Sequence, residues 1–355
     1  MTELTTNGTT PFVALTSASS FSVFSEAFAQ FAFGYGCAVQ RGGTVWCWGG
    51  NSYGALGEGI AMQPSSTFPV QVLTAIGGPA LKNITKVFVD HTTGLGACAI
   101  DASGNVWCWG DGYNGTLGNG VQSESPVAIP VLQSGATGSQ FTGVATMSIS
   151  SDHVCAVKMD GTIWCWGDNF YGQIGVGSAA TNLYLNPVQV TALGALGVDV
   201  DVSGVASCAV LKDTSVWCWG SNANGVLGDE TMSRSDTPVQ VLWQTGGSPV
   251  LGATQVVLPS AGYSACALTS GAPNQLICWG IYTASSEVIP PLPSPPTLYM
   301  DLNGNNSTYG IFALCRNTMN SSFPDFIDST GEFHEQGQAD SPPVTCPSSE
   351  GDAGP

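Results

Sequence analysis

The sequence predicts an all-β protein, a β-propeller of four-stranded blades with one disulfide per blade. We expect about six blades, with seven as the alternative count. Three observations support this prediction: one repeat recurs along the chain, its short strand-like stretches show almost no helical periodicity, and the 12 cysteines recur at regular spacing. Repeated units of four short strands are typical of propeller blades.

The repeat is clearest in four segments that align along their whole length. They are CAVQRGGTVWCWGGNSYGALGEG from Cys37, CAIDASGNVWCWGDGYNGTLGNG from Cys98, CAVKMDGTIWCWGDNFYGQIGVG from Cys155 and CAVLKDTSVWCWGSNANGVLGDE from Cys208. A fifth segment, CALTSGAPNQLICWG from Cys266, has two more residues in its turn. Each unit therefore contains a hairpin of two short strands.

Two further strands complete each unit. A strand-like stretch precedes the first cysteine, as in 86–89 and 198–202, and a Pro-Val pair such as Pro69-Val70 leads a short fourth strand. A sixth unit is degenerate. In it we expect strands at 298–302, 311–315 and 344–346.

The cysteines are placed to close each hairpin. Cys155 and Cys165 stand symmetrically about Asp160, which leaves a three-residue loop, and the third residue of such a loop is usually a left-handed glycine. Thr214 takes that place in the fourth unit, which is a departure. Directly opposed cysteines at a non-hydrogen-bonded site lie close enough to bridge, and each short loop should contribute ~3 kcal/mol. The predicted disulfides are Cys37–Cys47, Cys98–Cys108, Cys155–Cys165, Cys208–Cys218, Cys266–Cys278 and Cys315–Cys346.

This cysteine pattern argues against metal binding. Zinc sites usually show cysteines two to four residues apart, whereas this chain has no C-x-x-C, a dominant spacing of ten residues and only 3 histidines. We therefore expect no metal and no cofactor. Disulfides persist in oxidising compartments, so we expect an extracellular or cell-surface protein. The N-terminal MTELTTNGTT shows no leader pattern, which leaves the export route open.

The tryptophans lie on the opposite face of each hairpin from the cysteines. Side chains alternate along a strand, so Trp46 and Trp48 point away from Cys47, and Ala38 lies opposite Trp46. Nine of the 10 tryptophans occupy these positions, which favours packing between blades over a sugar-binding platform. The following loop reads G-x-N-x-x-G-x-[LI]-G, and we interpret its glycines and asparagine as turn formers.

The charge balance restricts the class of partner. The chain has 25 acidic and 7 basic residues, a formal net charge of −18. Nucleic acids and anionic membrane surfaces both attract lysine and arginine, so neither is an expected partner. The expected partners are other proteins or further copies of this chain.

No motif predicts catalysis. His91, His153 and His334 are scattered, with His91 and His153 just ahead of second strands and no nucleophile beside them. We therefore predict no catalytic residues. Six asparagines in N-x-[ST] contexts are candidate glycosylation sites: Asn7, Asn83, Asn114, Asn305, Asn306 and Asn320.

The combination of Cys-Ala strand, turn, WCWG, N-x-x-G-x-[LI]-G and Pro-Val resembles the regulator of chromosome condensation repeat. The resemblance covers about residues 24–290 well and extends weakly to 347. It implies a closed propeller, usually of seven blades, that serves as a protein-interaction surface. The founder exchanges nucleotide on a small GTPase and binds chromatin, whereas some secreted bacterial relatives inhibit enzymes. The paired cysteines resemble exported bacterial versions.

The domain prediction follows from these boundaries. Residues 24–347 form the propeller, 348–355 form a polar tail and 1–23 form a closure or assembly segment. Residues 24–36 suffice for the first strand, so 11–23 is surplus strand material. It would close its own ring in cis, which we favour, or add to a neighbouring copy in trans and build a filament.

Three hypotheses for function follow. The first is a non-enzymatic extracellular structural or adhesive module that self-assembles through the N-terminal segment. The second is a monomeric binder or inhibitor that uses one propeller face. The third, ranked last, is a hydrolase.

Overall fold

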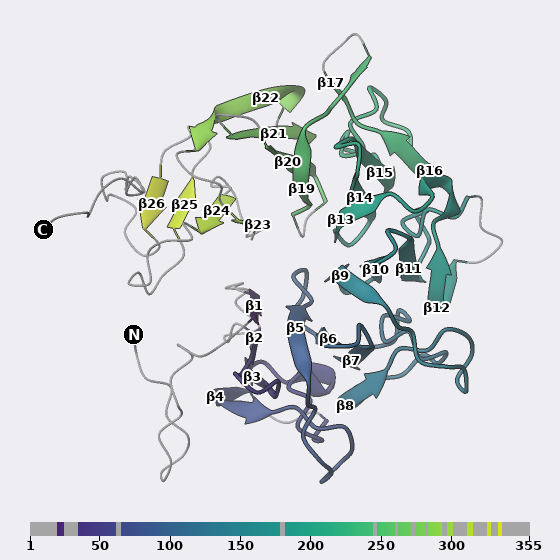
Figure 1. Ribbon diagram of the computed structural model, residues 1–355, viewed down its shortest axis with the longest axis vertical. Helices are drawn as coiled ribbons and strands as arrows, with labels where there is room; N and C mark the ends of the chain where they lie inside the picture. The colour runs from purple at the N-terminus through teal and green to yellow at the C-terminus, as the bar shows by residue number, and fades with distance from the viewer. Residues whose placement is uncertain are drawn as a thin grey trace, which may run out of the picture.

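The computed structural model describes residues 20–24, 35–61, 65–177, 182–243, 247–259, 262–270, 274–280, 283–292, 297–300, 311–314, 325–327 and 333–335. These residues form six antiparallel sheets of four strands each, arranged around a common centre (Figure 1), and a small two-stranded sheet of β17 (Leu242–Trp243) and β18 (Ser248–Pro249). The strands of each sheet are consecutive in the chain and pair in chain order from the centre outwards. The predicted all-β propeller of four-stranded blades is confirmed.

The strands have four equivalent places in the sheets. The innermost are β1 (Ser20–Phe24), β5 (Ile84–Val89), β9 (Val144–Ile149), β13 (Gly197–Val202), β19 (Ala253–Val257) and β23 (Thr297–Met300). The second strands are β2 (Tyr35–Val39), β6 (Gly96–Asp101), β10 (His153–Lys158), β14 (Ala206–Leu211), β20 (Ser264–Thr269) and β24 (Ile311–Leu314). The third are β3 (Val45–Gly49), β7 (Val106–Gly110), β11 (Ile163–Asp168), β15 (Val216–Gly220), β21 (Asn274–Gly280) and β25 (Asp325–Ile327). The outermost are β4 (Ser66–Gln71), β8 (Ser125–Pro130), β12 (Leu183–Gln189), β16 (Ser235–Gln240), β22 (Thr283–Leu292) and β26 (Phe333–Glu335).

The hairpins have the predicted register and disulfides. Cys155 pairs with Cys165, and the turn closes through the bond from the Lys158 amide to the Thr162 carbonyl. Five of the six predicted disulfides are present: Cys37–Cys47, Cys98–Cys108, Cys155–Cys165, Cys208–Cys218 and Cys266–Cys278. Cys315 and Cys346 lie outside the described residues. Thr214 is left-handed, with a φ of 68°, like the glycines that it replaces.

Neighbouring blades are joined at these turns. The carbonyl of the third turn residue accepts a hydrogen bond from the first amide of the innermost strand in the following blade. The Gly104 carbonyl accepts from the Val144 amide at 3.0 Å, and the Gly161 carbonyl accepts from the Gly197 amide at 2.8 Å. Thr214 adds a second bond, because its Oγ1 accepts from the Gly252 amide at 2.8 Å. This extra bond offsets part of the cost of a left-handed β-branched residue.

The tryptophans join the blades at the other end, which confirms their predicted role in packing. The last tryptophan of the hairpin is buried in the second to fifth blades and donates from Nε1 to the carbonyl that precedes the [LI]-G pair of the preceding blade, whereas Trp48 of the first blade is half-buried. These bonds are Trp109 to Ala55, Trp166 to Thr116, Trp219 to Gln173 and Trp279 to Val226. The last glycine of the loop makes room for the ring, because a Cβ on Gly175 would lie 2.7 Å from the Trp219 Nε1.

The Pro-Val pair lies in the second half of the fourth strand, not at its start as predicted. Strand β4 begins at Ser66, and Val70 pairs with Cys47. Proline is tolerated there because an outermost strand has one edge without a partner strand, where no amide hydrogen is needed.

Two predictions about the chain ends are wrong. The first strand is Ser20–Phe24, not a segment within 24–36, so part of the presumed surplus already belongs to the first sheet. In the sixth sheet the third strand is Asp325–Ile327 and a fourth strand is Phe333–Glu335, whereas we expected the third strand at 344–346. We expected the strand at Cys346 to pair with the second strand of this sheet, β24, but β25 pairs with β24 instead. Among the described strands, neither terminal sheet includes one from the other end of the chain.

Candidate protein-interaction face

The loops after the first and third strands of each sheet meet at one end of the molecule. We call this end the loop face and define it by residues 50–54, 90–95, 111–115, 150–152, 168–172, 203–205 and 221–225. The hairpin turns at 40–44, 102–105, 159–162 and 212–215 lie at the opposite end, which we call the turn face. Because the strands are antiparallel, this division follows from the topology alone.

The predicted turn-forming asparagine holds the long loop of the first, third and fourth blades, whereas the second blade has Gly112 at that position. Asn51 Oδ1 accepts from the Leu56 amide at 2.9 Å, and Asn222 Oδ1 accepts from the Leu227 amide at 2.9 Å. In both loops the leucine side chain is buried as a result. The loops are therefore rigid platforms, and the residues between asparagine and glycine are turned outwards.

Those outward positions carry a row of aromatic rings. Tyr53 is 37% exposed, Tyr113 52%, Phe170 58% and Tyr171 39%, whereas Trp109, Trp166 and Trp219 are buried. The rings of Tyr53 and Tyr113, from adjacent blades, meet edge to face with centroids 6.0 Å apart. Those of Phe170 and Tyr171 do so at 5.0 Å. Exposed aromatic rings that are held rigidly are enriched at protein interfaces.

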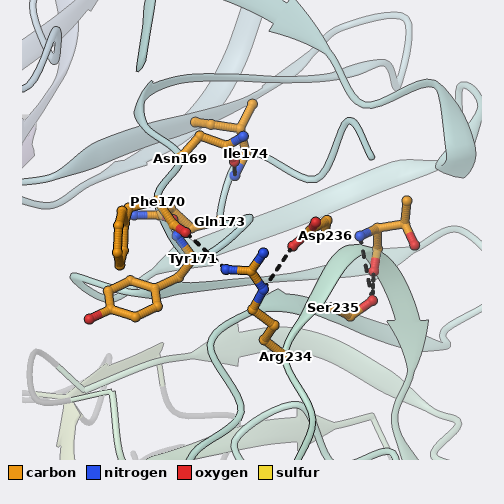
Figure 2. A network of polar contacts seen from close by, with 9 residues as sticks. Asn169, Phe170, Tyr171, Gln173, Ile174, Arg234, Ser235 and Asp236 are labelled. Atoms are coloured by element: carbon orange, nitrogen blue, oxygen red, sulfur yellow. Dashed lines mark hydrogen bonds and ion pairs between the residues drawn. The ribbon is translucent and has the colours of Figure 1, made fainter. Parts of the chain in front are cut away.

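An arginine from the fourth blade fastens one of these loops. Arg234 Nη1 donates to the Phe170 carbonyl at 3.1 Å, and its Nε lies 3.4 Å from Asp236 Oδ1. Figure 2 shows the guanidinium between the loop backbone and Asp236, with the rings of Phe170 and Tyr171 on the other side of the loop. The charge of Arg234 is therefore already paired within the protein.

Carboxylates flank the aromatic row. Asp111 Oδ1 accepts from the Tyr113 amide at 2.9 Å, and Asp168 Oδ2 accepts from the Phe170 amide at 3.4 Å, so each ring follows its own aspartate. Burial raises the pKa of Asp152, the hydrogen bond from Ser151 lowers it, and the charges of Asp168, Asp90 and Asp111 raise it further. This part of the loop face has a concentrated negative potential.

The described cations lie elsewhere. Arg41, Lys158 and Lys212 are in or beside the hairpin turns of the turn face, and Lys82 and Lys86 are at the start of β5, which is at the same end. Among the described residues, Arg234 is the exception. The protein is thus electrically polarised along its axis.

The histidines do not form a catalytic site. His153 is fully buried, and its Nε2 lies 2.7 Å from Ser207 Oγ. Ser207 donates its hydroxyl to the Gln173 carbonyl at 2.9 Å, so it accepts from His153 and is not poised as a nucleophile. Burial lowers the pKa of His153 to about 3, which keeps the ring neutral. His91 lies in the loop after β5, and His334 lies in β26.

Sequence reasoning missed a pair of buried acids on the innermost strand of the fourth blade. Asp199 Oδ2 accepts from the Val256 amide at 3.1 Å, and Asp201 Oδ2 accepts from the Leu258 amide at 2.6 Å. They satisfy amides on the free edge of β19 and so fasten the fourth blade to the fifth. Burial raises the pKa of Asp199 to about 7. The sequence feature that could have indicated this pair is the alternation of aspartate and valine in β13, an otherwise apolar strand.

The two described candidate glycosylation sites differ in access. Asn83 is exposed, whereas Asn114 donates from Nδ2 to Asp152 Oδ1 at 2.9 Å and to the Ser151 carbonyl at 3.2 Å. Asn7, Asn305, Asn306 and Asn320 lie outside the described residues. Within the described part of the chain, no group of histidine, cysteine and acidic side chains is suited to a metal ion, and no helix is long and apolar enough to span a membrane.

Comparison with known proteins identifies the repeat. A profile of the regulator of chromosome condensation (RCC1) repeat matches residues 103–157 and 160–208, and a second profile of this repeat matches 144–173. The matched residues carry RCC1 repeats, the repeat that the sequence pattern resembled.

Curated relatives share the RCC1 repeats over part of their length. The human E3 ubiquitin-protein ligase HERC2 is 33% identical over 199 residues, which cover 55% of this chain and 4% of that protein. The ultraviolet-B receptor UVR8 of Arabidopsis thaliana is 30% identical over 199 residues, 55% of this chain and 41% of the receptor. The mitochondrial RCC1 domain-containing protein RUG3 of the same plant is 26% identical over 270 residues, which cover 71% of this chain and 54% of RUG3. The chain therefore spans 54% or less of these relatives.

Solved RCC1-type structures share the fold. Human WBSCR16 superposes with a TM-score of 0.55 at 18% identity, covering 69% of this chain and 59% of that one. Yeast RCC1 (Prp20), in a structure bound to Kap60, superposes with a TM-score of 0.55 at 16% identity, covering 83% of this chain and 68% of the yeast chain. At these identities the comparison establishes the fold.

Proposed function

We propose that this RCC1 propeller is an extracellular, non-enzymatic protein-binding module that engages its partner through the loop face. The observation that carries the proposal is the row of exposed rings, Tyr53, Tyr113, Phe170 and Tyr171, on loops whose backbones are fixed by internal hydrogen bonds. Rigid aromatic side chains bind with a small loss of conformational entropy, which favours their use in recognition. Yeast RCC1 (Prp20), which shares this fold, is bound to Kap60 in its solved structure and so is a precedent for a protein of this fold that has a protein partner.

Disulfides support the extracellular location. The five described bridges each close one hairpin, and such bonds persist where the environment is oxidising. The low proportion of charged residues, 9%, leaves a surface of neutral hydrogen-bonding groups. Both features suit a protein that must hold its fold without cellular quality control.

Assembly by strand donation, the route expected from the sequence, would need an additional place in a sheet. The six blades already have four strands each, so a strand donated to a blade would have to add a fifth at an outer edge. The structural or adhesive role therefore rests on the loop face in our proposal, and filament formation is the second candidate.

The test is affinity capture from the extracellular medium of the source organism. The wild type is compared with a variant that carries Tyr53→Ser, Tyr113→Ser, Phe170→Ser and Tyr171→Ser. The matched control replaces exposed apolar residues nearer the turn face, Ile76→Ser and Leu196→Ser, which are 76% and 45% exposed. We expect a defined partner to be lost from the first variant and kept by the control. Equal capture by all three proteins would reject the loop face as the binding surface.

A further inference from the structure

The loop face combines exposed aromatic rings with carboxylates whose charge the described cations do not balance. Asp111, Asp152 and Asp168 are half-buried on adjacent loops of the second and third blades and act electrostatically on one another. The nearest described cation, Arg234, is held by Asp236 and the Phe170 carbonyl. A surface of this kind has both a negative potential and π-faces available to a ligand.

The pairing of each ring with an aspartate gives the surface a chemical preference. Tyr113 is hydrogen-bonded through its amide to Asp111, and Phe170 to Asp168, so an aromatic face and a carboxylate recur together on neighbouring blades. Lysine and arginine side chains suit such a pair, because the cation binds the carboxylate and stacks on the ring while the apolar stem covers the aromatic surface.

We infer that the partner presents a lysine- or arginine-rich segment, which lies across the Asp111–Tyr113 and Asp168–Tyr171 loops. This inference rests on the proposed function and names the class of partner. An acidic segment would be repelled by the same carboxylates, and the formal charge of −18 would slow its approach.

A second copy of this chain fits the loop face less well. Two of the five described cations towards the turn face are accompanied by an aspartate, since Lys158 is followed by Asp160 and Lys212 by Asp213. The hydrogen bonds that Thr162 and Ser215 donate lower the pKa values of Asp160 and Asp213, so both remain charged. These aspartates offset part of the positive charge of the turn face and so reduce its complementarity to the loop face.

The test measures binding of a fluorescein-labelled peptide of alternating lysine and glycine by fluorescence anisotropy. A peptide of alternating glutamate and glycine is the negative probe. We expect saturable binding of the lysine peptide that weakens as salt is added, and no binding of the glutamate peptide. Failure of the lysine peptide to bind while the aromatic variant still loses its captured partner would overturn the inference and leave the proposed function intact.

Variants separate a defined site from general attraction to an acidic protein. The double change Asp111→Asn and Asp168→Asn should weaken binding about tenfold, and Tyr113→Leu with Phe170→Leu by a similar factor. The control, Asp101→Asn with Asp213→Asn, removes the same charge at the turn face and should leave the affinity within about twofold. The proteins are produced in a host without N-glycosylation, because both control changes create N-x-[ST] sequences.

The turn-face control variant can also contradict the inference. An equal loss of affinity in the loop-face and turn-face aspartate variants would mean that the peptide responds to net charge alone. A doubling of the native mass on size-exclusion chromatography with light scattering, abolished by the Tyr113→Leu and Phe170→Leu variant, would assign the loop face to a second copy instead. Unchanged unfolding midpoints show that each variant is folded.

Discussion

A methyl group added to Gly175 should disrupt the packing between the third and fourth blades. Gly175 has a φ of 79°, and its added Cβ would lie 2.7 Å from Nε1 and 2.8 Å from Cδ1 of Trp219. The buried indole would have to move and would lose its 2.8 Å hydrogen bond to the Gln173 carbonyl. That carbonyl keeps the bond from Ser207, so the unsatisfied group would be the indole N–H.

A matched glycine, Gly143, separates the loss of stability caused by the clash with Trp219 from the loss caused by backbone strain. Gly143 has a φ of 78°, and nothing lies within 4 Å of a Cβ built on it. Both Gly143→Ala and Gly175→Ala carry the left-handed strain of about 1–2 kcal/mol. Gly175→Ala adds overpacking of about 1–3 kcal/mol and a lost hydrogen bond of about 1 kcal/mol. The expected difference in the free energy of unfolding is therefore about 2–4 kcal/mol.

The assay is urea unfolding followed by tryptophan fluorescence, without reductant so that the hairpin disulfides remain closed. Gly175→Ala should also change the near-ultraviolet circular dichroism, because Trp219 is displaced. Equal losses of stability in the two variants would refute the claim that the last loop glycine exists to admit the next blade's tryptophan.

Three further predictions concern the hairpins, the buried acids and the sequons. Replacing Cys208 and Cys218 together by serine should lower the free energy of unfolding by ~3 kcal/mol in urea, as expected for a short closed loop; no loss would show that the hairpin is held without its bridge. The folded protein retains a proton on Asp199 up to a pKa of about 7, whereas the unfolded chain releases it near its ordinary pKa of 3.8. Stability should therefore fall as pH rises from 4 to 7, and Asp199→Asn should flatten this dependence in urea titrations, with an unchanged slope contradicting the role of burial. In a glycosylating host, mass spectrometry of the folded product should find glycan on Asn83 and not on Asn114, whose amide is already bonded.

The repeat allowed the hairpins and their contacts to be predicted from sequence. A three-residue turn, opposed cysteines and alternation of side chains are local properties, so Cys155 could be paired with Cys165 and Trp46 placed opposite Ala38 without any tertiary information. The sixth sheet could not be predicted in the same way. Its strands Asp325–Ile327 and Phe333–Glu335 carry none of the motif residues, so the repeat could not predict their place or register.

The loop face could be predicted only in part. The motif identified Asn51 and its equivalents as turn formers, but it did not show which loop residues would point outwards. Tyr53 has a φ of 56°, a conformation that is rare for an aromatic residue and that depends on the packed loop around it. The buried pair Asp199 and Asp201 was missed because its partners are amides of another blade, which no sequence pattern marks.

Hydroxyl-radical footprinting of the protein alone and in complex with its captured partner tests the central claim most directly. Tyr53, Tyr113, Phe170 and Tyr171 report on the loop face, and Met159, which is 67% exposed in a hairpin turn, reports on the turn face. We predict that the partner protects the four rings from oxidation and leaves Met159 unchanged. Protection of Met159 with no change at the rings would contradict the account.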